Sequence, residues 1–173
     1  MALVPGEITP VNVTQLSTWQ ENEDLYQAAH AVDKDLSTWS ITAIDGVQWL
    51  KLEFNATYSI DQITIYHFFY TNWYDPNEYC VQSESNYREW KDHQSNVDIA
   101  VYQGDELQAS CGTLLLTYGL EQADQIYTFN CTASGDTVLL SKSGQILVTE
   151  IVVTGRTSGI TYKTDGDLSP GRV

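Results

Sequence analysis

The stretch Val47-Gln-Trp-Leu-Lys-Leu-Glu-Phe54 alternates strictly between apolar and polar side chains. In an extended chain Leu50, Leu52 and Phe54 fall on one face, and their charged neighbours fall on the other. A period of two is typical of a β-strand that turns one face toward a core. The stretch therefore predicts a strand in a sheet that is covered on one side.

The same alternation returns along most of the chain. Clusters of Gly, Asn, Asp and Ser separate the apolar segments, and helical periodicity is confined to a short helix expected near 23–29. Further strands are expected over Ile60–His67, Val97–Tyr102, Gln125–Cys131, Thr137–Leu140 and Gln145–Val153. Many short strands with turn signals between them predict an all-β sandwich or barrel. The length of 173 residues suits one domain, expected over 1–162, with 163–173 as a polar linker.

The charge of the chain limits its partners. Eight Lys and Arg against 23 Asp and Glu give a formal net charge of −15. Such a field repels nucleic acid, and it argues against membrane lipid as a partner. No apolar run approaches the roughly 20 residues that cross a bilayer. A cation is the partner that this charge favours.

Two acidic features could hold such a cation. An early turn reads Ala31-Val-Asp-Lys-Asp-Leu-Ser-Thr-Trp39, and Glu150 interrupts the otherwise apolar strand 146–153. An ionised Glu in an apolar run is costly unless it is paired. The turn offers the carboxylate, hydroxyl and carbonyl oxygens that Ca²⁺ prefers.

Other interpretations of these residues stay open. The spacing of Asp33, Asp35 and Ser37 matches the start of an EF-hand loop, but Thr38 and Ile44 stand where Gly and Glu are needed. Asp33 could instead bond its own backbone in a turn. Glu150 could equally be paired with Lys34 or Lys51.

The cysteines point to an oxidising compartment. Cys111 and Cys131 flank a segment of hairpin size, and a disulfide between them would contribute about 3 kcal/mol in the chain-entropy model. Cys80 is then left free or paired with another molecule, although it could also replace one member of this pair.

Three glycosylation sequons begin at Asn12, Asn55 and Asn130. Together with the cysteines they indicate a secreted domain of a larger extracellular protein.

Five segments carry a resemblance to a known superfamily, in matching order and spacing. They are Ala31–Asp35, Gln48–Phe54, Ile60–Tyr66, Asn96–Tyr102 and Thr149–Gly155. With them the chain resembles the galactose-binding-like jelly-roll superfamily, which includes F-type lectins, discoidin or coagulation-factor C-type domains and related carbohydrate-binding modules. The resemblance implies a jelly-roll β-sandwich.

The resemblance also implies a structural Ca²⁺ ion that ties the early turn to the last strand. The implied ligands are side chains of Asp33 and Glu150, carbonyls of His30, Asp35 and Thr149, and a hydroxyl from Ser40 or from Thr38. The sequence departs from the family at Lys34 and Asp35, where Gly and Asn are usual.

Ligands of these jelly rolls meet loops at one end of the sandwich, and the long stretch 68–96 is the corresponding loop here. It combines aromatic faces, which stack on sugar C–H groups, with polar groups that bond hydroxyls. The candidate ligand-binding residues are His67, Tyr70, Trp73, Tyr74, Asp75, Arg88, Trp90, Lys91 and His93. Two alternatives remain: His67 as a hydrogen-bonded core edge, and Trp73 and Trp90 as anchors of their own loop. The Arg-x-Asp pattern of fucose binders is missing, so fucose specificity is not transferred.

Together these features predict a secreted, calcium-stabilised, non-catalytic, lectin-like domain whose partner is an extracellular glycan or glycoprotein. A protein-interaction or self-associating domain of the same fold is the alternative, because aromatic and Arg surfaces also make protein contacts. Membrane binding through aromatic side chains of the long loop is a third possibility, but the net charge of −15 argues against it. Catalysis is not expected, because no Gly-x-Ser-x-Gly, His-Glu-x-x-His or phosphate-binding glycine motif occurs.

Overall fold

The computed structural model describes residues 1, 5–68, 94–116 and 125–157 of the chain. Its main sheet has the order β1-β3-β6-β4-β5, and β8 pairs with β3 on a separate edge. All pairings within this sheet are antiparallel. Its strands are β1 (Asn12–Gln15), β3 (Val47–Tyr66), β4 (Val97–Gln103), β5 (Glu106–Leu114), β6 (Ile126–Ser143) and β8 (Glu150–Thr157).

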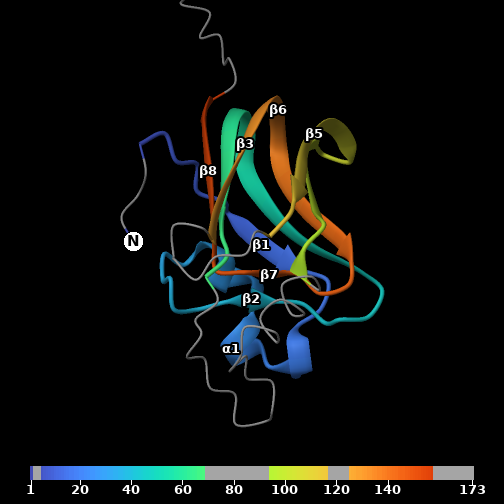
Figure 1. The fold of residues 1–173 in the computed structure, drawn as a ribbon. Helices are drawn as coiled ribbons and strands as arrows, with labels where there is room; N and C mark the ends of the chain where they lie inside the picture. The colour runs from blue at the N-terminus through green and yellow to red at the C-terminus, as the bar shows by residue number, and fades with distance from the viewer. Residues whose placement is uncertain (2–4, 69–93, 117–124, 158–173) are drawn as a thin grey trace, which may run out of the picture.

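Strands β3 and β6 are long and strongly curved, and they link the parts of the sandwich (Figure 1). The first part of β3, up to Glu53, pairs with β1 and with the second part of β6. After an irregularity between Glu53 and Tyr58, the second part of β3 pairs with β8 and with the first part of β6. Bulges of this kind bend a strand without ending its ladder. The strands expected separately over 47–54 and 60–67 are therefore one bent strand.

A second, two-stranded sheet closes one end of the sandwich. It pairs β2 (Ser40–Ile41) with β7 (Leu147–Val148). The helical segments η1 (Trp19–Glu21), α1 (Glu23–Tyr26) and η2 (Ala28–Val32) precede β2. Figure 1 shows α1 and β2 at the end of the molecule opposite to the last residues of β8. The expected short helix near 23–29 is therefore found as two short turns.

The core follows the alternation seen in the sequence. The inward side chains of β3, Leu50 and Leu52, are fully buried, and Ile63 and Ile65 continue the same face beyond the bulge. Buried apolar residues of the other strands complete this core, including Ile99, Val101, Val138, Leu140, Ile151 and Val153. Burial of this apolar surface is the main stabilising term of the fold.

Strands β1, β2 and β5 were not expected from the sequence. Strand β1 reads Asn-Val-Thr-Gln and lies at an edge, where only one side chain packs against the core. Strand β5 reads Glu-Leu-Gln-Ala-Ser-Cys-Gly-Thr-Leu, and of its residues only Leu114 is fully buried. Edge strands with exposed side chains lack the apolar signal that periodicity detects.

The disulfide between Cys111 and Cys131 is confirmed, with the two Cα atoms 5.1 Å apart. It joins edge strand β5 to the first part of β6, and these two strands are not neighbours in the hydrogen-bonded order of the sheet. The bridge therefore ties the free edge of β5 back to the sandwich. Cys80 lies outside the described residues.

The architecture is the antiparallel jelly-roll sandwich that the sequence predicts. Within the described residues no helix has the length and apolar character needed to cross a membrane. The linker expected over 163–173 lies outside the described part of the chain, so that prediction stays open.

Candidate functional site

The early acidic turn is held by its own hydrogen bonds. The backbone N–H of Asp35 donates to Oδ1 of Asp33 at 2.9 Å, and the Thr38 hydroxyl donates to Oδ2 at 2.7 Å. The N–H and hydroxyl of Ser37 both donate to Oδ1 of Asp35, at 2.9 and 2.6 Å. These are side-chain-to-backbone turns of the kind that Asp forms locally. Both carboxylates are thus used inside the turn.

Glu150 opens strand β8 and is fully buried, with an exposed fraction of 0%. The backbone N–H of Lys34 donates to its Oε2 at 3.1 Å, and Nζ of Lys34 lies 3.1 Å from its Oε1. One residue of the turn therefore contacts both oxygens of the carboxylate. This confirms the alternative in which Lys34 is paired with Glu150.

The position of Lys34 depends on an uncommon backbone conformation. Its φ of 65° lies in the left-handed region that glycine adopts most readily. The same ammonium also forms an ion pair with Glu7, which lies beside Thr154 of β8. The side chains of Lys34 and Glu7 are 22% and 5% exposed. Three charged groups from three segments therefore meet at the edge of β8.

Burial and pairing act in opposite directions on this cluster. Burial raises the pKa of Glu150 to about 7, while the hydrogen bonds and charge of Lys34 act against that rise. Burial lowers the pKa of Lys34, but the bonds and charges of Glu7 and Glu150 outweigh it, so its pKa is raised overall. Lys34 is therefore held in its charged form and favours the ionised form of Glu150.

The residues expected to hold Ca²⁺ are brought near one another, but their contacts do not suit a divalent ion. The Ser40 hydroxyl is buried and donates to Gln15 at 2.6 Å. The Asp35 carbonyl accepts the Thr38 hydroxyl at 3.0 Å. His30, whose carbonyl was the expected ligand, lies in the short helical segment η2.

Oε1 of Glu150 accepts no hydrogen bond from the described residues, and a buried oxygen of this kind could bind a metal. However, the Lys34 ammonium lies beside the same oxygen. Within the described residues no group of three or more His, Cys, Asp or Glu side chains could hold an ion. The calcium ion stays a prediction that this geometry does not favour.

The long loop is attached to the sandwich where its first described neighbour, Phe68, meets Thr149. The backbone N–H of Phe68 donates to Oγ1 of Thr149 at 2.8 Å, and both groups are buried. The indole N–H of Trp39 donates to the Phe68 carbonyl at 2.8 Å. Phe68 is thus fixed between the early turn and the start of β8.

The other side of the loop returns to the same end of the molecule. Nε2 of Gln94 donates to Oε1 of Gln145 at 2.5 Å, and both side chains are buried. Nε2 of Gln145 in turn donates to the Thr42 carbonyl at 3.0 Å. The two residues that flank 69–93 therefore both bind the segment 145–149, beside the β2–β7 sheet.

Of the candidate ligand residues, His67 alone lies within the described part of the chain. Tyr70, Trp73, Tyr74, Asp75, Arg88, Trp90, Lys91 and His93 lie outside the described residues. His67 is described and is only 3% exposed. Burial lowers its pKa to about 4, so the imidazole is neutral at physiological pH. These properties favour the interpretation of His67 as a core-edge residue that positions the loop.

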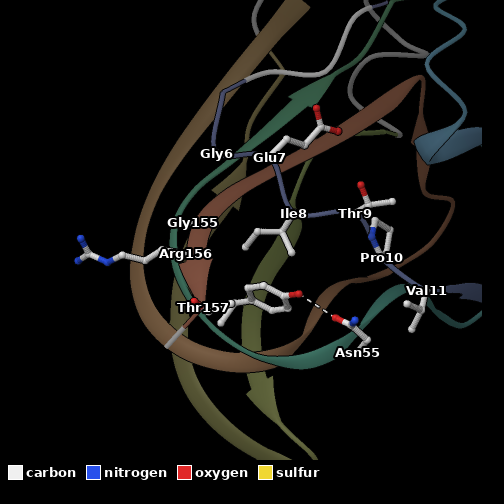
Figure 2. A pocket seen from close by; sticks show the side chains of 11 residues that line it. Gly6, Glu7, Ile8, Thr9, Pro10, Val11, Asn55, Gly155, Arg156 and Thr157 are labelled. Atoms are coloured by element: carbon white, nitrogen blue, oxygen red, sulfur yellow. Dashed lines mark hydrogen bonds between the residues drawn. The ribbon is translucent and has the colours of Figure 1, made fainter. Parts of the chain in front are cut away.

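The described surface also has a shallow pocket of about 480 Å³. It lies between the segment 6–11, the bulge of β3 and the last residues of β8, 155–157. Figure 2 shows the Asn55 side chain bonded to a tyrosine in this pocket, while the Arg156 side chain points outward. Since Tyr58 pairs with Thr157 and Tyr66 pairs with Glu150, this pocket is at the opposite end of β8 from the loop attachment. It is therefore not part of the loop site.

A second pocket of about 360 Å³ lies on the outer surface of β3 and β6. Glu53, Asp105 and Asp136 line it together with Lys51. It contains none of the candidate ligand residues and carries no assignment.

Sequence reasoning missed the contributions of Glu7 and of the two buried glutamines. No periodic signal marks Glu7, because it precedes the first strand. Gln145 was included in an expected strand, but a buried amide gives no local sign of its partner. The left-handed backbone at Lys34, in contrast, could have been expected, because Gly is usual at this position in the superfamily that the sequence resembles.

Comparisons with known proteins support the architecture. No protein-family model and no curated protein sequence matches the chain. Solved structures do match. A fucose binding module of Streptococcus pneumoniae has a TM-score of 0.60 at 13% identity, and the match covers 84% of this chain and 91% of that one.

Two further structures show the same similarity. A CBM32 module from Clostridium perfringens, in complex with GalNAc-β-1,3-galactose, has a TM-score of 0.59 at 14% identity, with 83% of this chain and 94% of that chain covered. An F-lectin (fucolectin) from serum of Morone saxatilis, the striped bass, has a TM-score of 0.60 at 12% identity, with 86% and 46% covered. These matches show that the chain has the galactose-binding-like jelly-roll fold. The fold that the resemblance in the sequence implied is therefore confirmed.

Proposed function

We propose that this chain is a non-catalytic carbohydrate-binding domain that recognises an extracellular glycan or glycoprotein through the stretch 69–93. The observation that carries the proposal is the double attachment of this stretch. Phe68 and Gln94 are bound to Thr149 and Gln145 at one end of a jelly roll. Solved proteins of similar fold include a fucose binding module, a CBM32 module in complex with GalNAc-β-1,3-galactose and an F-lectin.

The composition of the stretch supports a sugar rather than another ligand. It contains Trp73 and Trp90, which offer flat apolar faces for the C–H side of a pyranose. Arg88, Lys91 and Asp75 offer charged donors and an acceptor for hydroxyls. Recognition residues on a loop that is fixed to a rigid scaffold are common in binding proteins.

We place this domain outside the cell. The disulfide fits an oxidising compartment. The three sequon asparagines, Asn12, Asn55 and Asn130, are all exposed. Expression in a mammalian secretory line, followed by enzymatic removal of N-glycans, tests this part of the proposal. We expect a drop in apparent mass that disappears when the three asparagines are changed to Gln.

A glycan array with the oxidised protein tests sugar binding. We expect binding to at least one class of glycan, and its loss in Trp73→Ala or Trp90→Ala. Leu107→Ala is the matched control, because Leu107 is exposed on the β4–β5 hairpin. An array without signal from protein whose circular dichroism confirms folding would contradict the proposal.

Contact with a partner protein or with a second copy is the alternative, and one described feature favours it. Ile44, which lies between β2 and β3, is 61% exposed, and Val47, the first residue of β3, is 65% exposed. Exposed apolar pairs of this kind contribute to protein contacts. Light scattering after size exclusion, for the wild type and Ile44→Ser, separates the two functions. A dimer that dissociates in the variant and ignores added sugars would favour the alternative.

A further inference from the structure

We propose that the ammonium of Lys34 takes the place of a divalent cation in this jelly roll, so that an internal lysine joins the early turn to β8. The clasp, defined here as Glu7, Lys34 and Glu150, therefore closes without calcium. This inference concerns the scaffold and goes beyond the proposed sugar binding.

The geometry of the clasp carries the proposal. Nζ of Lys34 forms ion pairs with Glu7 and with Oε1 of Glu150, the latter at 3.1 Å. The N–H of the same residue binds Oε2 of Glu150 at 3.1 Å. A single residue thus joins the early turn to the last strand, as the expected ion would, and it also binds the N-terminal segment through Glu7.

Burial makes the bridge necessary for the fold. Glu150 is fully buried and Glu7 is 5% exposed, so water cannot replace the ammonium at these carboxylates. A buried carboxylate without a partner is strongly unfavourable. The left-handed φ of 65° at Lys34 is an added cost that the fold accepts. The contacts of the lysine compensate for that cost.

Charge opposes a calcium ion beside this lysine. An ion at its usual distance of about 2.4 Å from Oε1 would lie at most about 5.5 Å from Nζ, because Nζ is 3.1 Å from the same oxygen. At that separation two cations repel strongly in a buried setting. Both carboxylate oxygens of Asp33 and Oδ1 of Asp35 also accept hydrogen bonds within their own turn. The turn therefore has few free ligands to offset this repulsion.

Thermal unfolding in calcium and in chelator tests the proposal on the intact chain. The wild type is expected to melt at the same temperature in millimolar calcium and in excess chelator. Lys34→Met keeps the length and apolar stem of the side chain but removes its charge, and we expect its Tm to fall by roughly 10 °C. Lys51→Met is the matched control, because Lys51 pairs with Glu53 at 3.4 Å in a partly exposed position. Its Tm is expected to stay close to that of the wild type.

Two results would overturn the proposal. One is a wild-type Tm that rises by several degrees in calcium, or stoichiometric calcium uptake by the wild type in calorimetry. The other is a Lys34→Met variant as stable as Lys51→Met. The wild-type measurements need no variant, so the proposal remains testable even if Lys34→Met does not fold.

Discussion

The backbone N–H of Lys34 binds Oε2 of Glu150 at 3.1 Å, across 116 positions of the sequence. This contact belongs to the main chain and does not involve the lysine side chain. The ion pair between Nζ and Oε1 is separate and depends on the lysine alone. Removing the side chain therefore leaves the turn in place beside a carboxylate that has lost its counterion.

The first prediction follows from this separation of roles. Lys34→Gly keeps the left-handed φ at no steric cost and removes the ammonium. We expect this variant to become calcium-responsive, with a Tm that rises by about 5 °C in millimolar calcium. Scanning calorimetry with calcium, magnesium and chelator measures the effect. If the Tm of the variant is the same in calcium, in magnesium and in chelator, the oxygens that remain in the turn and in β8 do not bind the ion.

The second prediction concerns pH and His67. Burial lowers its pKa from 6.5 to about 4, so the unfolded chain binds a proton at a higher pH than the folded chain does. The neutral, buried His67 therefore contributes to the stability of the fold above pH 6.5, the pKa of the unfolded state. This contribution is lost as the pH falls toward 4. The loss amounts to about 3 kcal/mol when the shift is complete.

Glu150 acts in the opposite sense. The pKa of Glu150 is raised from 4.5 to about 7, so its contribution to stability is greatest below pH 4.5, the pKa of the unfolded state, and is lost as the pH rises through 7.

Urea unfolding of the wild type and of His67→Gln, from about pH 4 to about pH 8, isolates the effect of the histidine. We expect the variant to lose less stability in acid. Parallel pH curves for the two proteins would contradict this expectation.

The third prediction concerns the attachment of the loop. Thr149→Val keeps the shape of the side chain but leaves the buried N–H of Phe68 without its acceptor. Such a loss costs about 1–3 kcal/mol. We expect faster hydrogen exchange at the Phe68 amide and weaker glycan binding.

Thr128→Val is the control, since the Thr128 hydroxyl lies 3.2 Å from that of Thr64 in an exposed position. Equal protection of the Phe68 amide in Thr149→Val and in the wild type would mean that the attachment does not depend on this bond.

The fourth prediction concerns the disulfide. Cys111 and Cys131 are 20 positions apart, and the bridge ties edge strand β5 to β6. Changing both residues to Ser is expected to lower the free energy of unfolding by about 3 kcal/mol. Denaturant unfolding of the wild type with and without reductant should give a change of similar size. A stability unaffected by reductant would mean that the edge of β5 is held by its other contacts.

Much of the fold could be predicted because strand signals are local. The apolar residues Leu50, Leu52, Ile63 and Ile65 fall inside the core where their alternation places them. The disulfide pairing was also predictable, because two cysteines flank one hairpin-sized segment. The edge strand β5 was not predicted, since most of its side chains are exposed and give no apolar period.

The candidate site was predicted less completely. The sequence singled out Glu150 and the turn at Asp33, and the fold does bring the turn to the strand through Lys34. It left the partner of Glu150 open between a metal, Lys34 and Lys51. It did not indicate Glu7, because a charged residue in an irregular segment has no pattern that reveals its partner.

The sequence by itself determined an acidic, β-rich chain, the inward faces of its strands and the cysteine pair that could close its edge. Only the tertiary structure decided that β3 and β6 bend at bulges, that His67 is buried, and that Lys34 reaches Glu150. The reason is physical. Alternation is a property of neighbouring residues, whereas the partner of a buried charge depends on strand register and on a backbone turn more than a hundred residues away.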